Sequence, residues 1–173
     1  MPSMQGCRRL FCVHRRLNVE GLWYKEAKTD RSFMVKILPG ESIVEKLTET
    51  VKELGIQYCV IVSAVGSVTD VKFRGIKTGA KLPITRPRMT IHEIEYPMEL
   101  LGLNGNIFPD QNGEPDCHLH IQMSKSSGEV LGGHLFNANV FASCEIMITE
   151  LSAMGIERHV SKSAGTPTIF IEE

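Results

Sequence analysis

Residues 117–135 read CHLHIQMSKSSGEVLGGHL, and this segment combines an alternating apolar pattern with three histidines. Two apolar runs, 117–123 and 129–135, flank a Ser-Ser-Gly turn at 126–128. Two such runs separated by a short loop that contains glycine indicate a β-hairpin. The stretch therefore predicts two neighbouring antiparallel strands.

The first strand of this hairpin carries two histidines, His118 and His120. Residues two apart in a strand point to the same face of a sheet. Leu119 and Ile121 then point to the opposite face, which we expect to be the core. Cys117 borders the histidines, and its position directs it to the core face rather than toward a ligand set.

The register of the hairpin places a third histidine, His134. A three-residue loop pairs Lys125 with Glu129, and counting back from this pair sets His120 opposite His134. Directly opposite residues have Cβ atoms about 4.5–5.5 Å apart, close enough for two imidazoles to share one ion. His118 is the diagonal neighbour. A shift of the turn by one residue would send His134 to the other face and remove the site.

Three imidazoles with an open fourth position are what a water-binding zinc site needs, although imidazole also binds nickel, copper and iron. Gly132 and Gly133 leave space beside His134 for a ligand or for backbone. The alternative is three ordinary half-buried histidines on a polar sheet face. The presence of three histidines on one face of one hairpin favours metal binding.

Outside the hairpin, the pattern predicts one helix and several strands. Residues 41–54 carry apolar residues at helical spacing, and Gly55 follows as a stop signal. One helix among many strands indicates an α+β domain with a predominantly antiparallel sheet and one main helix packed on it. Further strands are expected over residues 32–38, 58–65, 68–76, 91–107 (interrupted by Pro97), 143–152 and 169–171.

Three local features refine this pattern. The nearly continuous apolar run 58–65 predicts a strand that is covered on both faces. Gly66 is expected at a bend or bulge. Val140 and Phe141 are candidates for a short second helix.

The 173 residues fit one domain, which we expect over residues 29–173, behind an extension of residues 1–28. Residues 1–17 contain four arginines and no acid, as short organellar targeting segments do. A disordered extension is the favoured alternative, because the segment is not rich in serine. The five scattered cysteines indicate reduced thiols, and there is no run of 18 apolar residues. We expect an intracellular protein that does not bind membranes. Its expected location is the cytoplasm, unless residues 1–17 direct it to an organelle.

Other titratable residues are weaker candidates. Glu99 lies in the apolar context PMELL, where a catalytic role and a structural ion pair are equally supported. His92 is expected at a surface strand position and joins the site only if its strand is adjacent. His14 and His159 are expected to be solvated.

Several separated blocks of the sequence resemble the plant- and prokaryote-conserved (PPC) domain family, from about residue 31 to 151. The blocks are LPGE at 38–41, SAVGSV at 63–68, ELLGLNGNI at 99–107, HLH at 118–120 and GEVLGGH at 128–134. The resemblance implies an antiparallel α+β fold similar to that of acetolactate decarboxylase, where histidines hold a catalytic zinc, and assembly as a homotrimer. Plant members carry AT-hook segments, act on AT-rich DNA and generally lack the histidines. This sequence has no Arg-Gly-Arg-Pro hook and keeps the histidines, as stand-alone prokaryote-type members do.

Two functional hypotheses follow. In the first, His118, His120 and His134 hold zinc or another divalent metal in a metabolite-binding protein or a metal-dependent hydrolase or lyase that acts on a small molecule. In the second, the protein is an oligomer that binds DNA or another partner without catalysis. The net charge of −1 gives nucleic-acid binding no support. The best basic patch, equally explained by a solvated loop, comprises Lys72, Arg74, Lys77, Lys81, Arg86 and Arg88.

Overall fold

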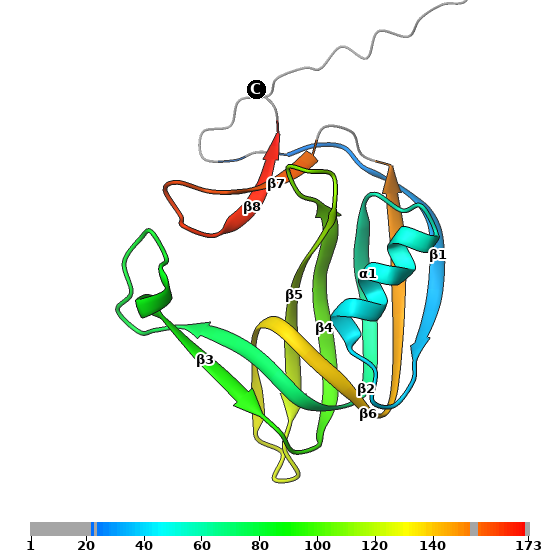
Figure 1. Cartoon of the computed structure of the whole chain (residues 1–173), viewed down its shortest axis with the longest axis vertical. Helices are drawn as coiled ribbons and strands as arrows, with labels where there is room; N and C mark the ends of the chain where they lie inside the picture. The colour runs from blue at the N-terminus through cyan, green and yellow to red at the C-terminus, as the bar shows by residue number, and fades with distance from the viewer. Residues whose placement is uncertain (1–21, 23, 153–155, 172–173) are drawn as a thin grey trace, which may run out of the picture.

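An antiparallel sheet of six strands carries most of the fold (Figure 1). The computed structural model describes residues 22, 24–152 and 156–171. The elements in chain order are β1 (Lys28–Ile37), α1 (Ile43–Glu53), β2 (Cys59–Ile76), the 3₁₀ turn η1 (Arg86–Arg88), β3 (Met89–Ile94), β4 (Met98–Pro109), β5 (Pro115–Ser124), β6 (Val130–Ser152), β7 (Ile156–Val160) and β8 (Pro167–Ile171).

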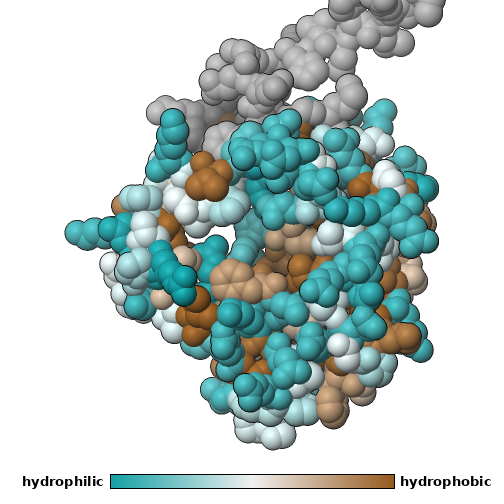
Figure 2. Space-filling view, in the orientation of Figure 1, coloured by the Kyte–Doolittle hydropathy of each residue, from teal (hydrophilic) through white to brown (hydrophobic). Residues whose placement is uncertain are grey.

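The sheet has the order β1-β6-β5-β4-β2-β3, and an additional pairing of β6 with β2 closes four of its strands into a ring. The long strands β2 and β6 bend at bulges so that each pairs with three neighbours. At one bulge Gly66 has φ +151°, and a Cβ there would lie 2.1 Å from the carbonyl oxygen of Ser143. The bulge predicted at Gly66 is therefore confirmed, and its cause is close backbone approach. β7 and β8 form a separate hairpin beside a hollow in the surface (Figure 2).

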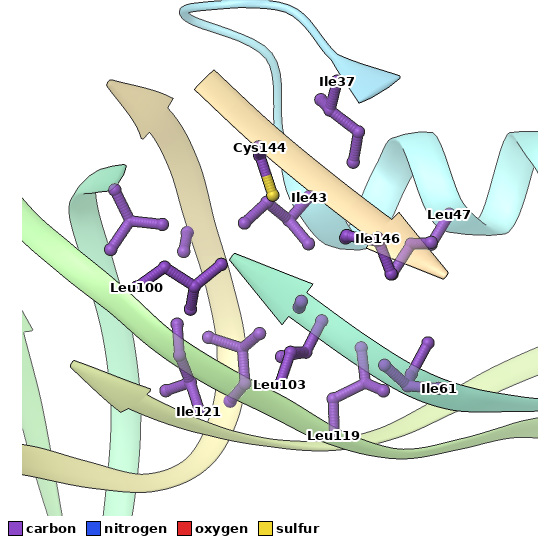
Figure 3. Close-up of a cluster of buried hydrophobic side chains, with 14 of the residues drawn as sticks. Ile37, Ile43, Leu47, Ile61, Leu100, Leu103, Leu119, Ile121, Cys144 and Ile146 are labelled. Atoms are coloured by element: carbon purple, nitrogen blue, oxygen red, sulfur yellow. The ribbon is translucent and has the colours of Figure 1, made fainter. Parts of the chain in front are cut away.

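Helix α1 covers one face of the sheet and closes the core. Ser42 caps its N-terminus by accepting a hydrogen bond from the backbone N–H of Glu45. Ile43, Leu47 and Val51 form its buried stripe, and burying such a side chain contributes about 1.5–3 kcal/mol. Figure 3 shows helix residues packed against side chains of the sheet, which explains why a short amphipathic helix is stable here.

The sequence pattern predicted most of these elements. The helix expected over 41–54 forms over Ile43–Glu53. The interruption at Pro97 separates β3 from β4. The hairpin of 117–123 with 129–135 is confirmed within β5 and β6.

Two expectations are wrong, and one strand was not predicted. Val140 and Phe141 belong to strand β6 rather than to a helix, because Val140 pairs with Val68 of β2 and points into the core. Residues 58–65 are not covered on both faces, since Val62 and Val65 are 53% and 58% exposed where no helix lies over them. Strand β7 was not expected at all, because its sequence IERHV alternates too briefly to predict a strand.

The predicted extension of residues 1–28 lies outside the described residues, apart from residues 22 and 24–28. In the part of the chain that is described, no helix is long and apolar enough to cross a membrane.

Candidate metal centre

The register of the β5–β6 hairpin is the one that the turn predicts. The backbone N–H of Lys125 donates to the carbonyl of Glu129 at 3.0 Å, and that of Gly128 donates to the carbonyl of Lys125 at 2.9 Å. Gly128 supplies the positive φ of +82° that the turn requires. His120 and His134 are consequently direct partners across the two strands.

This register gathers three imidazole rings on one face. Ring centroids lie 5.5 Å apart for His118 and His120, 5.2 Å for His118 and His134, and 5.5 Å for His120 and His134. One nitrogen of each ring lies within 4.8 Å of the other two. Tetrahedral zinc with bonds of about 2.0–2.1 Å requires nitrogens about 3.3 Å apart. Rotating the side chains so that each nitrogen moves by roughly an ångström would bring the three nitrogens to the spacing that zinc requires.

The opposite face of β5 belongs to the core, as predicted. Leu119 and Ile121 are 1% and 0% exposed. The Sγ atom of Cys117 lies 3.5 Å from the Oγ1 atom of Thr48 on α1. Burial raises the pKa of the Cys117 thiol, and its sulfur contacts the helix rather than the histidines.

Strand β6 has a second neighbour at His134, because it pairs with β2 on its other side. Arg74 is the partner of His134 there, so its side chain belongs to the face that carries the histidines. Gly132 and Gly133 allow the backbones of the two neighbouring strands to approach β6 closely, because these residues have no side chains. A Cβ at Gly133 would lie 2.4 Å from the carbonyl oxygen of Arg74, and one at Gly132 would lie 2.4 Å from that of Ile121. The space at these glycines is therefore filled by backbone rather than by a ligand.

The electrostatic surroundings suit the histidines to metal binding. Burial, reinforced by the charge of Arg74, lowers the pKa of His134 to about 4. Burial, followed by the charge of Arg158, lowers the pKa of His118. Both rings are thus unprotonated near pH 7, as metal coordination requires. The Nδ1 atom of His134 is buried and has no hydrogen-bond partner among the described residues. A donor set of three imidazoles, one with a buried nitrogen that lacks a partner among the described residues, fits a divalent transition metal.

A pocket of about 430 Å³ opens over the three histidines. The β7–β8 hairpin contributes Arg158, Thr166 and Pro167 to its wall. Figure 1 shows this hairpin as a separate unit beside the six-stranded sheet. The turn between β7 and β8 is held by a hydrogen bond of 2.7 Å from the backbone N–H of Ile84 to the carbonyl of Ala164. The pocket volume lies in the range typical of small-molecule sites.

Sequence reasoning missed two charged residues at this site. The carboxylate of Asp116 lies 2.9 Å from Nε of Arg158, whose Nη2 donates to Oδ1 of Asn106. Asp116 precedes His118 by two residues, so strand alternation could have placed it on the same face. Arg158 lies in the unexpected strand β7, and no signal in the sequence points to it.

The structure does not bring Glu99 to the histidines. Its partner on β5 is Ser124, four residues beyond His120, which corresponds to about 13 Å along the strand. Glu99 is exposed and does not line the pocket. His92 is also exposed and stacks on Phe73 with ring centroids 4.8 Å apart, away from the pocket wall.

The basic patch is partly engaged within the protein. Lys72 forms an ion pair of 2.6 Å with Glu93. The guanidinium of Arg88 donates to the carbonyls of Lys81 and Pro83. Arg74 lines the histidine pocket. Two of the six basic side chains are therefore engaged in contacts of the domain itself, and a third lies in the histidine pocket.

Fold and site together define an α+β domain that carries a candidate three-histidine metal centre on one face of its sheet. The family model for the Plants and Prokaryotes Conserved (PCC) domain matches residues 24–152. The chain belongs to this family, as its sequence blocks predicted.

Solved structures agree with this assignment. A metal-containing protein from Archaeoglobus fulgidus superposes with a TM-score of 0.74 at 29% identity, covering 88% of this chain and 100% of that one. A plant- and prokaryote-conserved protein from Pyrococcus horikoshii has a TM-score of 0.71 at 25% identity, covering 82% of this chain and 92% of that one. These proteins share the fold over nearly their full length.

Curated relatives are longer. The bifunctional protein GlmU of Synechococcus sp. (strain JA-3-3Ab) is 22% identical over 144 residues, which are 83% of this chain and 21% of that protein. The AT-hook motif nuclear-localized protein 14 of Arabidopsis thaliana is 29% identical over 110 residues, which are 61% of this chain and 24% of that protein. This chain thus spans about a fifth to a quarter of the length of these relatives.

Proposed function

We propose that the protein binds one divalent metal ion, zinc by preference, through His118, His120 and His134, and presents it to a small molecule in the adjoining pocket. The observation that carries this proposal is the set of three ring nitrogens within 4.8 Å of one another on one sheet face. The similarity to the metal-containing protein of Archaeoglobus fulgidus supports it.

The residues of the chain prepare this site in two ways. Strand pairing fixes His120 against His134, so that the ligands need little reorganisation. Burial keeps the pKa of His118 and His134 low, so that protons compete weakly for their nitrogens. When bound, a zinc ion held by three histidines polarises a carbonyl or activates a water molecule, which is the chemistry of metal-dependent hydrolases and lyases. A catalytic role for Glu99 remains a prediction. The residue is exposed and does not line the pocket.

Metal content of protein purified without a histidine tag tests the proposal. We expect about one ion per chain in the wild type and in His92→Ala, which removes an exposed histidine away from the pocket. His120→Ala should lose the ion, with affinity reduced by 100-fold or more, since even the loss of outer-shell partners costs about 10- to 100-fold. Equal stoichiometry in His120→Ala and His92→Ala would contradict the proposal.

We also propose that the chain forms a homotrimer. Apolar side chains on β1, β6 and β2 support assembly through the sheet face that α1 leaves open. Met34 pairs with Met147 across β1 and β6, and Met34, Val62 and Val65 are exposed. Sedimentation equilibrium should give three times the chain mass of 19.3 kDa. A species of one chain mass at micromolar concentration would contradict assembly.

DNA binding is the second candidate, favoured by the similarity to an AT-hook motif nuclear-localized protein. The charge of −1 and the internal contacts of the basic patch weigh against it. A fluorescence titration with AT-rich duplex at low salt tests it. Dissociation constants weaker than about 10⁻⁴ M, below ordinary non-specific affinity, would exclude this function.

A further inference from the structure

The fully charged side chains around the histidine pocket are mostly positive. Two arginines, Arg74 and Arg158, line the pocket against a single carboxylate, that of Asp116. A divalent ion at the histidines would add two positive charges beside them. With the ion held by the histidines, a concave site with excess positive charge attracts anions.

Arg74 contacts a sulfur atom rather than a carboxylate. Its Nη1 atom lies 2.7 Å from the sulfur of Met89, and a thioether is only a weak acceptor. Among the described residues no carboxylate forms an ion pair with it. Its side chain is half-buried and shares the sheet face of His134. A half-buried guanidinium without a carboxylate partner, next to candidate metal ligands, is suited to bind an external anion.

Arg158 is only 3% exposed and has a structural task. Its contacts with Asp116 and Asn106 attach β7 to the sheet. Its Nη1 atom is buried without a hydrogen-bond partner in the described part of the chain, and its Nε atom meets the Asp116 carboxylate as an ion pair without forming a hydrogen bond. A buried donor without an acceptor is costly and therefore uncommon. An oxygen of a bound anion would satisfy it.

We propose that the pocket binds a small molecule through a carboxylate or phosphate group, which lies between the metal ion and the guanidinium groups of Arg74 and Arg158. The planar fork of N–H donors of arginine matches both of these oxyanions. The volume of about 430 Å³ admits a metabolite of small size. The inference rests on the proposed function, because the metal ion supplies one side of the anion site.

Cobalt-substituted protein provides the test, since the visible spectrum of cobalt reports its fourth ligand. Inorganic phosphate and acetate are titrated separately, against chloride at equal ionic strength, into wild type, Arg74→Met, Arg158→Lys and Arg31→Met. Arg31 is a matched control, because it is an exposed arginine on the edge strand β1 and pairs with Glu150 of β6. Metal content is measured on each sample.

We expect phosphate or acetate to change the wild-type spectrum, and whichever binds more tightly identifies the type of oxyanion. Arg74→Met should weaken that binding roughly 10- to 100-fold, the usual effect of losing a charged hydrogen bond, while Arg31→Met binds as wild type and metal content is unchanged in both. Arg158→Lys should weaken it as well; if that variant does not fold, Arg74→Met decides. Metal-loaded wild type that binds neither anion more tightly than chloride, or Arg74→Met that binds as wild type, would overturn the inference.

A failure of metal binding itself is separable from these results. If wild type takes up no cobalt, the proposed function fails, and calorimetric titration of the metal-free protein tests the arginines alone. Anion binding that Arg74→Met abolishes would then support the arginine site, and no binding would overturn it.

Discussion

The two faces of strand β5 carry different side chains and have different surroundings. Leu119 and Ile121 are buried in the core beneath α1, whereas His118 and His120 face the pocket on the other side. One strand of alternating residues therefore supplies both the stability of the fold and its candidate chemistry. Substitutions on the two faces should have different consequences, and the following predictions test that separation.

The largest effect should come from the core face. Leu119→Ala should lower the free energy of unfolding by roughly 2–5 kcal/mol, because it leaves a cavity in a packed core. His120→Ala, at an exposed position, should change it by no more than about 0.5 kcal/mol in metal-free protein. Chemical denaturation monitored by circular dichroism measures both. Equal losses would show that the two faces are not separate.

Metal should stabilise the protein only through the histidine face. Zinc at 100 times its dissociation constant should raise the free energy of unfolding by about 2.7 kcal/mol. This zinc-dependent increase in the free energy of unfolding should be absent in His120→Ala. It should persist in Leu119→Ala when the variant with zinc is compared with the same variant without zinc. Thermal melts with zinc and with a chelator measure this, and a zinc-dependent shift in His120→Ala would contradict it.

The histidine face should also make metal-free protein sensitive to acid. The pKa of His134 falls to about 4 in the folded chain from an ordinary value of 6.5. Between these values the unfolded chain binds a proton that the folded chain does not, so stability is lost as the pH falls from 6.5 toward 4. His134→Gln should show a smaller decrease in melting temperature over this range. Parallel pH curves for the two proteins would refute the assignment.

The smallest effect is expected at Glu99, which lies outside the pocket. Glu99→Gln should leave zinc affinity within about twofold and unfolding free energy within about 0.5 kcal/mol of wild type. Calorimetric zinc titration measures the affinity. A large loss of zinc binding would instead connect Glu99 to the centre through contacts that a single chain does not contain.

The sequence predicted what depends on local rules. Alternation separates His118 from Leu119, and a three-residue turn sets the pairing of His120 with His134. Both follow from residues within one hairpin, so no long-range information was needed. The helix was predictable for the same reason, because its apolar spacing and its stop signal are local.

The rest of the site depends on pairings between distant parts of the chain. Arg74 reaches the pocket because β2 pairs with β6, sixty residues later, through several bulges that no sequence pattern announces. Arg158 reaches it on the short strand β7. The helix expected at Val140 does not form for a related reason. Val140 pairs with a distant residue of β2, and this pairing overrides the local preference of the sequence.

Anomalous X-ray diffraction at the zinc absorption edge, from crystals of tag-free protein, shows directly whether the three histidines bind a metal ion. We expect one strong peak per chain, bonded to nitrogens of His118, His120 and His134 at about 2.0–2.1 Å. The absence of a peak from zinc-supplemented crystals, with the three rings turned away from one another, would contradict it.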